Sequence, residues 1–220
     1  ETGIINDIWG FNVMKLIEGI KQKGKPFEIP DCSRDELPEL FNQMGYKVGV
    51  EVGVYKGAFT EKFCKAGLKM YAIDPWMPFR GQGRSQHNQD RQDFLYEHTK
   101  RTLEPYSDCT IVRKTSQDAI KKFGARSLDF VYIDGDHRFP YVAHDVYEWF
   151  WKIRPGGIIS GHDYFCTSPG ATNVICHVKS IIDAFVGTFG IDNFWTFGRS
   201  KPIELKTKDD KYLSWMFFKK

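Results

Sequence analysis

Two apolar runs in the second half of the chain each lead directly into titratable residues. Asp134, Asp136 and His137 follow the first run, and His162 and Asp163 follow the second. Carboxylates bind hard divalent cations, and an imidazole can accept a proton near neutral pH. The set is therefore suited to deprotonating a hydroxyl or to holding a metal ion. The alternative is purely structural, because an Asp at such a position also caps the helix that follows it.

A glycine-containing turn marks the first half of the chain, where residues 48–60 change from a β-branched run into a helical pattern. Gly53 and Gly57 lie at that change, where backbone can approach a ligand closely and helix N–H groups point outward. Asp74 follows Gly53 by 74 − 53 = 21 residues, close to the spacing of about 20 at which an acid meets a ribose hydroxyl. The turn lacks the G-x-G-x-x-G pattern, since Tyr55 stands at a glycine position, which argues against NAD. An ordinary strand-to-helix turn is the alternative.

These residues need elements that bring them together, and the chain alternates between strand and helix patterns. Such alternation, with ligand-type residues at strand ends, predicts an open, mostly parallel sheet with helices on both faces and ligands at the carboxyl ends of the strands. A terminal pair of strands can join this sheet antiparallel. The expected strands are 48–52, 69–74, 110–113, 128–134, 157–160, 194–197 and 212–218, and the expected helices are 5–20, 33–45, 59–66, 90–103, 140–153 and 174–189.

Length and composition favour one core. A chain of 220 residues with 41% hydrophobic content can bury a single sizeable core, so we expect an N-terminal helical extension and linker, 1–32, followed by one domain, 33–220. No apolar run approaches the roughly 18 residues of a membrane span. The net charge of +3 comes from interspersed charges, which predicts no nucleic-acid partner.

Two polar segments without periodicity, 75–89 and 165–172, are expected to be loops beside the ligand crevice. Between them, His144, Asp145 and Glu148 lie off the apolar stripe of a helix, which predicts that they face solvent.

The five cysteines show neither a Cys-x-x-Cys pair nor zinc spacing. A bridge between Cys166 and Cys176 and a set of unpaired thiols are the two alternatives. The first residues, Glu-Thr-Gly, resemble the scar left after a secretion signal is removed, which predicts the secretory lumen (Golgi) or secretion. The chain has no Asn-x-Ser/Thr sequon, so a cytoplasmic location is the alternative.

Taken together, several short motifs from residue 33 onward resemble a class I S-adenosylmethionine-dependent methyltransferase, and specifically the small O-methyltransferases of methyltransferase family 24. Each motif is weak alone, but their order and spacing are specific. The resemblance implies a Rossmann-like, seven-strand sheet whose last strand is antiparallel. The motifs are Glu51-Val-Gly-Val-Tyr-Lys-Gly57, Asp74-Pro-Trp76, Ser116-Gln117, Asp134-Gly-Asp-His137, Pro155-Gly-Gly157 and Gly161-His-Asp-Tyr164.

The resemblance implies S-adenosylmethionine as the cofactor. By position in the motifs, Glu51 and Gly53 would contact its methionine part, Asp74 its ribose, and Ser116 and Gln117 the adenine edge. Trp76 would pack on the adenine ring. The full set of cofactor-binding residues that the resemblance implies is Glu51, Gly53, Tyr55, Gly57, Asp74, Trp76, Ser116, Gln117 and Asp134.

The resemblance also implies chemistry at the second cluster. Metal-assisted relatives carry one carboxylate after the fourth strand and an acid–amide pair after the fifth, which here correspond to Asp134 and to His162 with Asp163. His137 falls where those relatives place the base. We therefore take His137, Asp134 and Asp163 as catalytic candidates, and Asp134, His162 and Asp163 as ligands of Mg²⁺ or Mn²⁺. A histidine in place of the first acid departs from the pattern, because imidazole favours softer ions.

The resemblance implies metal-assisted O-methyl transfer to a small-molecule or glycan hydroxyl, and together with the expected secretory origin it favours a sugar. Aromatic residues near the expected crevice suit a carbohydrate ring or a phenol, so a catechol or phenol acceptor is the first alternative. The second is a cofactor-binding module without catalysis that serves as a partner surface. A homodimer is left open. The aromatic residues are Trp76, Phe79, Tyr164 and Phe165.

Overall fold

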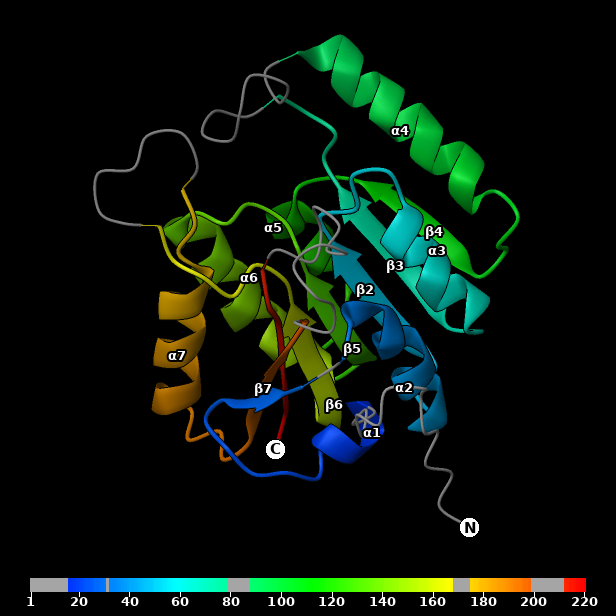
Figure 1. The fold of residues 1–220 in the computed structure, drawn as a ribbon. Coiled ribbons are helices and arrows are strands. Elements are labelled where there is room, and N and C mark those ends of the chain that lie inside the picture. Colours follow the sequence, from blue (N-terminus) through cyan, green and yellow to red (C-terminus); the bar gives the residue numbers. More distant parts are fainter. Residues whose placement is uncertain (1–15, 31, 79–87, 168–174, 199–211) are drawn as a thin grey trace, which may run out of the picture.

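A twisted eight-stranded sheet forms the centre of the described chain (Figure 1). The structure is a computed structural model, and it describes residues 16–30, 32–78, 88–167, 175–198 and 212–220. The strand order is β1-β7-β8-β6-β5-β2-β3-β4. The strands are β1 (Phe27–Ile29), β2 (Val48–Val52), β3 (Lys69–Asp74), β4 (Cys109–Arg113), β5 (Leu128–Ile133), β6 (Ile153–Gly161), β7 (Phe194–Phe197) and β8 (Ser214–Phe218).

Helices cover both faces of the sheet. The side chains of β5 show why, because successive residues of a strand point to opposite faces. Phe130 and Tyr132 pack in the core with α1, α2 and α3, whereas Val131 and Ile133 pack in the core with α6 and α7. The helices are α1 (Leu16–Gly19), α2 (Leu37–Gln43), α3 (Ala58–Lys65), α4 (Gln89–Leu103), α5 (Ser116–Ala119), α6 (Phe139–Lys152) and α7 (Val178–Thr188), with short 3₁₀ turns η1 (Arg34–Glu36) and η3 (Ile120–Lys122).

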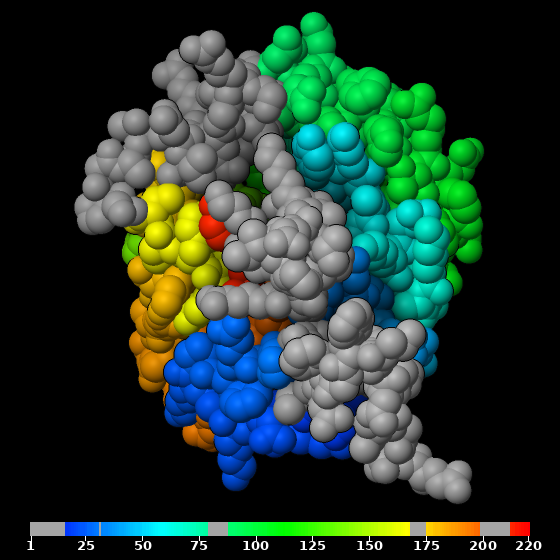
Figure 2. All heavy atoms as spheres, in the orientation of Figure 1, coloured from blue at the N-terminus to red at the C-terminus, as the bar shows by residue number. Residues whose placement is uncertain are grey.

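Strand directions confirm the predicted fold class. All neighbouring pairs are parallel except those that β8 makes with β6 and β7, so β8 runs opposite to the rest. In the space-filling view, α4 in green and α7 in orange lie on opposite flanks of the molecule (Figure 2). No helix in the described ranges has the length and apolar character to cross a bilayer.

The interpretation of the end of segment 1–32 as a linker was wrong. Phe27–Ile29 forms β1, which pairs with β7 and adds an eighth strand to the expected seven. Ile29 is buried in the same core as Phe41, so this segment packs onto the sheet instead of spanning a gap. A strand of three residues is too short for its alternation to be visible in the sequence.

Most expected element boundaries agree with the structure, including the capping box in which Ser33 and Glu36 exchange side-chain and backbone hydrogen bonds. Most of the expected helix 5–20 lies outside the described residues, as do 79–87, 168–174 and 199–211 of the expected loops and terminal turn. Phe79, expected among the aromatic residues near the crevice, is one of these.

The turn after β2 brings two strands unusually close. The amide of Asp134 donates to the carbonyl of Val52 at 2.8 Å, and the backbone of Gly53 has a φ of 90°. A Cβ at residue 53 would lie 2.1 Å from the carbonyl oxygen of Asp134, which is closer than any real contact. Glycine at this position is therefore required both by conformation and by the approach of the strand ends.

Replacing Gly53 by alanine should destabilise the fold by at least about 3 kcal/mol, because the methyl group forces the β2 and β5 ends apart. The matched control is Gly67→Ala, since Gly67 has a similar φ of 80° and no atom lies within 4 Å of the position that its Cβ would take. That substitution should cost only about 1–2 kcal/mol, which is the strain of the left-handed conformation. Urea unfolding of both variants measures the difference, and equal losses would show that the close approach does not matter.

Candidate functional site

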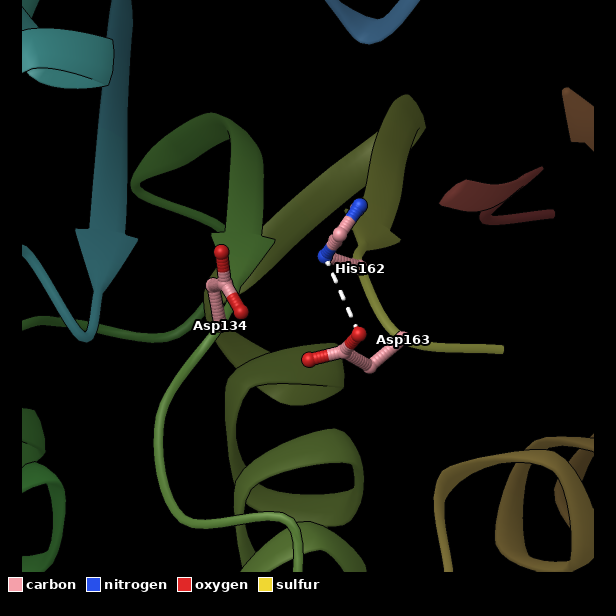
Figure 3. Close-up of side chains that lie close together, drawn as sticks. All are labelled: Asp134, His162 and Asp163. Atoms are coloured by element: carbon pink, nitrogen blue, oxygen red, sulfur yellow. Dashed lines mark ion pairs between the residues drawn. The ribbon is translucent and has the colours of Figure 1, made fainter. Parts of the chain in front are cut away.

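Three titratable side chains meet where β5 and β6 end (Figure 3). Asp134 follows the last residue of β5, and His162 and Asp163 follow the last residue of β6. The strands are in register there, with Ile133 opposite Gly161, so their carboxyl ends reach the same edge. One ligand atom from each of the three residues lies within 4.8 Å of the others. The predicted metal ligands are thus brought together by the parallel sheet.

His137 completes this cluster from the loop after β5. Its Nε2 lies 2.8 Å from Oδ2 of Asp163 and 4.0 Å from Oδ1 of Asp134. The side chain is only 14% exposed. On the other side of Asp163, Nδ1 of His162 lies 3.3 Å from Oδ1. Asp163 is therefore held between two imidazoles, one from its own strand end and one from the neighbouring loop.

The charges in the cluster favour an ion pair. Burial alone would lower the pKa of His137, but the hydrogen bond with Asp163 and the charges of Asp134, Asp163 and Asp136 outweigh it and raise the pKa. Burial alone would raise the pKa of Asp163, but hydrogen bonds with His137 and His162 hold that pKa well below its usual value. The imidazolium–carboxylate form is thus favoured for this pair.

Arg34 is a site residue that sequence reasoning missed. Its Nη1 donates to Oδ2 of Asp134 at 3.1 Å and to the Tyr132 hydroxyl at 3.3 Å, and its guanidinium lies 5.0 Å from the centre of the Phe59 ring. The capping box starting at Ser33 was visible in the sequence and fixes this turn. The partner of Arg34, however, lies 100 residues away, and no local pattern reveals it.

Backbone strain gathers around the same edge of the sheet. Among the described residues, four non-glycine residues have a positive φ: Tyr55, Trp76, Arg126 and Asp163. Three of them, all except Arg126, are predicted site residues. Such conformations cost free energy and persist where surrounding contacts impose them, most often at functional sites.

The turn expected to bind the cofactor is organised by Asp74. Its Oδ2 accepts the amides of Val54 and Tyr55 at 3.0 Å each, and its Oδ1 accepts the amide of Trp76 at 2.8 Å. Burial raises the pKa of Asp74 although these three hydrogen bonds act to lower it. A carboxylate has about four acceptor sites. The residues present therefore fit a ribose hydroxyl at the remaining site, while Asp74 also holds the turn together.

The two residues expected to contact adenine, Ser116 and Gln117, point in different directions. The Ser116 hydroxyl accepts from the indole nitrogen of Trp149 at 2.8 Å and bonds to Asp145, so it points into the protein, whereas Gln117 is exposed at the start of α5. The expectation that Asp145 faces solvent was wrong. This carboxylate is 4% exposed, because α6 turns it inward towards Ser116 and the loop at Gly135.

Aromatic rings expected at the mouth of the crevice are mostly packed inside. Trp76 is 1% exposed and donates its indole N–H to the carbonyl of Tyr55, which places the ring under the turn. Tyr164 is 8% exposed, with its hydroxyl bonded to Asp183. Phe165 stacks on Tyr212 with ring centres 3.8 Å apart. Adenine stacking by Trp76 stays a prediction, and it would require a face that the described packing covers.

Glu51 lies beneath the turn, 2% exposed, and accepts a hydrogen bond from the Thr60 hydroxyl. Burial is the largest effect on this carboxyl and raises its pKa to about 8, aided by the charge of Asp134 and opposed by Thr60. The side chain ties β2 to α3, the two elements joined by the glycine turn. Contact of Glu51 with the methionine part of a cofactor stays a prediction.

A family model described as a methyltransferase domain matches residues 50–164. This range begins in β2 and ends directly after the Asp134 and Asp163 cluster, so it contains the glycine turn and both halves of the candidate site apart from Arg34. No curated protein sequence matches the chain.

Solved structures with the same fold include several methyltransferases. The O-methyltransferase from Bacillus cereus in complex with SAH has a TM-score of 0.57 at 15% identity, covering 86% of this chain and 83% of that one. TomG, an O-methyltransferase from Streptomyces achromogenes in complex with SAM, has a TM-score of 0.54 at 14% identity, covering 84% and 79%. The N-methyltransferase NodS from Bradyrhizobium japonicum has a TM-score of 0.55 at 14% identity, covering 84% and 94%. At these identities the likeness shows the fold.

The buried carboxyl of Glu51 makes stability depend on pH. Because the folded pKa is about 8 and the unfolded pKa is near 4.5, the folded chain holds a proton that the unfolded chain releases. The free energy of unfolding should therefore fall as pH rises from 4.5 to 8, by at most about 1.4 kcal/mol per pH unit. Glu51→Gln should flatten this slope in urea unfolding, whereas Glu39→Gln, at an exposed position, should keep it. Parallel slopes for all three proteins would contradict the prediction.

Proposed function

The chain belongs to the methyltransferase-domain family, and from this premise we propose that it transfers the methyl group of S-adenosylmethionine to a hydroxyl oxygen. One observation carries the proposal: the acid–imidazole cluster stands directly against the glycine turn. Gly53 and Asp134 are so close that no Cβ fits between them. A donor on the turn and an acceptor at the cluster would thus be neighbours, as an in-line displacement needs.

On the donor side, the cofactor supplies an electrophilic methyl group on a sulfonium. The chain's own residues would bind and orient it: the backbone of the turn from Gly53 to Gly57 along one edge, and the Asp74 carboxylate at a ribose hydroxyl. Two of the similar structures were solved with SAH or SAM, which supports this choice of cofactor.

On the acceptor side, His137 would remove the proton of the attacking hydroxyl at Nδ1, the ring nitrogen that does not face Asp163. Asp163 orients the imidazole through the 2.8 Å contact and stabilises the imidazolium that proton transfer produces. The raised pKa of His137 favours the protonated imidazole, and a neutral imidazole must form before the ring can act as a base. A cation bound to the carboxylates of Asp134 and Asp163 would weaken the attraction that raises this pKa.

A divalent cation held by Asp134, His162 and Asp163 would have this effect. The donor set of two carboxylates and one imidazole fits such an ion. The three ligand atoms lie within 4.8 Å of one another, which is close enough for them to bind one ion together. When bound, the ion would stabilise negative charge on the acceptor oxygen. Because one of the three ligands is an imidazole, the set should bind Mn²⁺ more tightly than Mg²⁺. Arg34 would keep its hydrogen bond to Oδ2 of Asp134, and Oδ1, which faces the cluster, would bind the ion.

For the acceptor, we favour a sugar or glycan hydroxyl over a catechol or phenol. The groups around the cluster are charged hydrogen-bonding side chains, among them Arg34 and the Asp136–Arg138 pair. Trp76 and Tyr164, whose rings would have served a flat phenol, are buried. A polyhydroxylated acceptor uses such a polar surface better than an aromatic one does.

The proposal predicts that the wild-type chain binds S-adenosylmethionine in isothermal titration and that His137→Ala keeps this affinity. Turnover of the variant should fall by roughly 10²-fold or more, since the general base is lost. His98→Ala, assayed at saturating cofactor, is the matched control, because His98 lies on α4 and contacts the carbonyl of Lys56 on the donor side instead of the cluster. Unchanged turnover in His137→Ala would remove this residue from the mechanism.

The acceptor is found by transfer of labelled methyl groups to panels of sugars, catechols and amines. Labelled sugars support the proposal, and labelled catechols point to the first alternative. Labelling of an amine would indicate that the chain methylates nitrogen and would contradict the proposed transfer to oxygen. A wild-type chain that shows no cofactor binding at millimolar concentration would instead indicate a non-catalytic module.

The proposed metal site predicts that chelation abolishes turnover and that Mn²⁺ restores it more effectively than Mg²⁺. Asp163→Asn should weaken Mn²⁺ binding by roughly tenfold or more. Asp136→Asn is the control, because Asp136 is a nearby carboxylate that pairs with Arg138 and lies outside the three-residue set. Full turnover in excess EDTA would leave Asp134, His162 and Asp163 as orienting groups only.

A further inference from the structure

The loop that carries His137 is fastened to the start of α7 by one residue. The amide of His177 donates to the carbonyl of His137 at 2.9 Å, and Nδ1 of the His177 ring accepts from the amide of Phe139 at 3.0 Å. His177 therefore holds segment 137–139 at both of its ends, although it lies 38 residues beyond Phe139 in the chain.

We propose that His177 is a positioning residue for the methyl transfer: it fixes segment 137–139 so that the His137 imidazole stays against Asp163. This inference rests on the proposed function, because it concerns the base of that reaction. His177 itself acts through His137, and both of its hydrogen bonds to the segment go to backbone atoms.

His177 is in turn held by packed helices. It is the N-cap residue of α7, and its carbonyl accepts from the amide of Ile181 at 3.2 Å in the first turn of that helix. Ile181 and Ile182 of α7 are buried in one core cluster with Val146 of α6, and the two helices lie side by side (Figure 1). A group supported by packed helices is placed more precisely than one supported by a loop alone.

The bond to the His177 ring also satisfies the first amide of α6. Phe139 is the first residue of that helix, where an amide has no acceptor within the helix itself. A ring nitrogen that accepts a hydrogen bond carries no proton, so the bond requires neutral His177 with its proton on Nε2. An asparagine at this position could make the same bond, because its Oδ1 is attached to Cγ as Nδ1 is in histidine.

The His137 ring needs this support because both of its nitrogens have a role. Its Nε2 lies 2.8 Å from Oδ2 of Asp163, and its Nδ1 is the atom proposed to take the acceptor proton. The direction of the ring follows from the backbone of residue 137, whose carbonyl His177 holds. Since a misplacement of about 1 Å can cost about 10²-fold in rate, a loosened segment should slow the reaction.

The test compares His177→Ala with His177→Asn. Turnover at saturating cofactor should fall by roughly tenfold or more in His177→Ala and recover in His177→Asn. The affinity for S-adenosylmethionine in isothermal titration should stay unchanged in both, because His177 bonds to the acceptor side of the site. Lys179→Ala is the control, since Lys179 lies in the same first turn of α7 but pairs with Asp183.

A second measurement does not depend on activity. Diethyl pyrocarbonate modifies histidine rings, and tryptic peptide 127–138 contains His137 as its sole histidine. The initial rate of this modification should rise by roughly fivefold in His177→Ala, since fewer hydrogen bonds hold the segment, and should stay at the wild-type value in His177→Asn. If the wild-type chain shows no methyl transfer, the proposed function fails and these rates alone decide whether His177 positions His137.

Equal turnover or equal His137 reactivity in the wild type and His177→Ala would overturn the inference, as would equal losses in His177→Ala and His177→Asn. If His177→Ala does not fold, amide hydrogen exchange in the wild-type chain decides. The Phe139 amide should then exchange at least about tenfold more slowly than in an unstructured peptide, and exchange at the unstructured rate would overturn the inference.

Discussion

The structure depends on the contact between the ends of β2 and β5. Gly53 turns away from β2 with a positive φ, and the carbonyl of Asp134 occupies the space where any side chain at residue 53 would lie. This contact sets the distance between the turn that follows β2 and the cluster that follows β5. The parallel register carries the same edge on to Gly161 of β6, which places His162 and Asp163 opposite Asp134. One steric constraint thus positions both halves of the site.

Much of this arrangement could be predicted from the sequence, since it follows from local patterns. The apolar runs ending in Asp74 and Asp134 specify buried parallel strands, and parallel strands bring their carboxyl ends to one edge. The capping box at Ser33 and the reversed direction of β8 were likewise visible as a local motif and a terminal strand pair.

The parts that escaped prediction depend on contacts across long sequence separations. Strand β1 has only three residues, and its pairing with β7 spans most of the chain. Asp145 looked solvent-facing because a carboxylate off the apolar stripe usually is, yet hydrogen bonding with Ser116 compensates its burial. Arg34 escaped prediction for the same reason, because it joins elements whose proximity only the assembled sheet defines.

The charge balance of the site has a consequence for the proposed reaction. Asp134 and Asp163 face Arg34 and His137, and the raised pKa of His137 favours its protonated form, in which two positive side chains balance the two carboxylates. A divalent cation entering this cluster would add charge that the low-dielectric surroundings penalise unless a positive charge leaves. Arg34 cannot lose its proton in a protein, whereas His137 can. Cation binding at the carboxylates would therefore be coupled to release of the His137 proton, which generates the base that the hydroxyl acceptor needs.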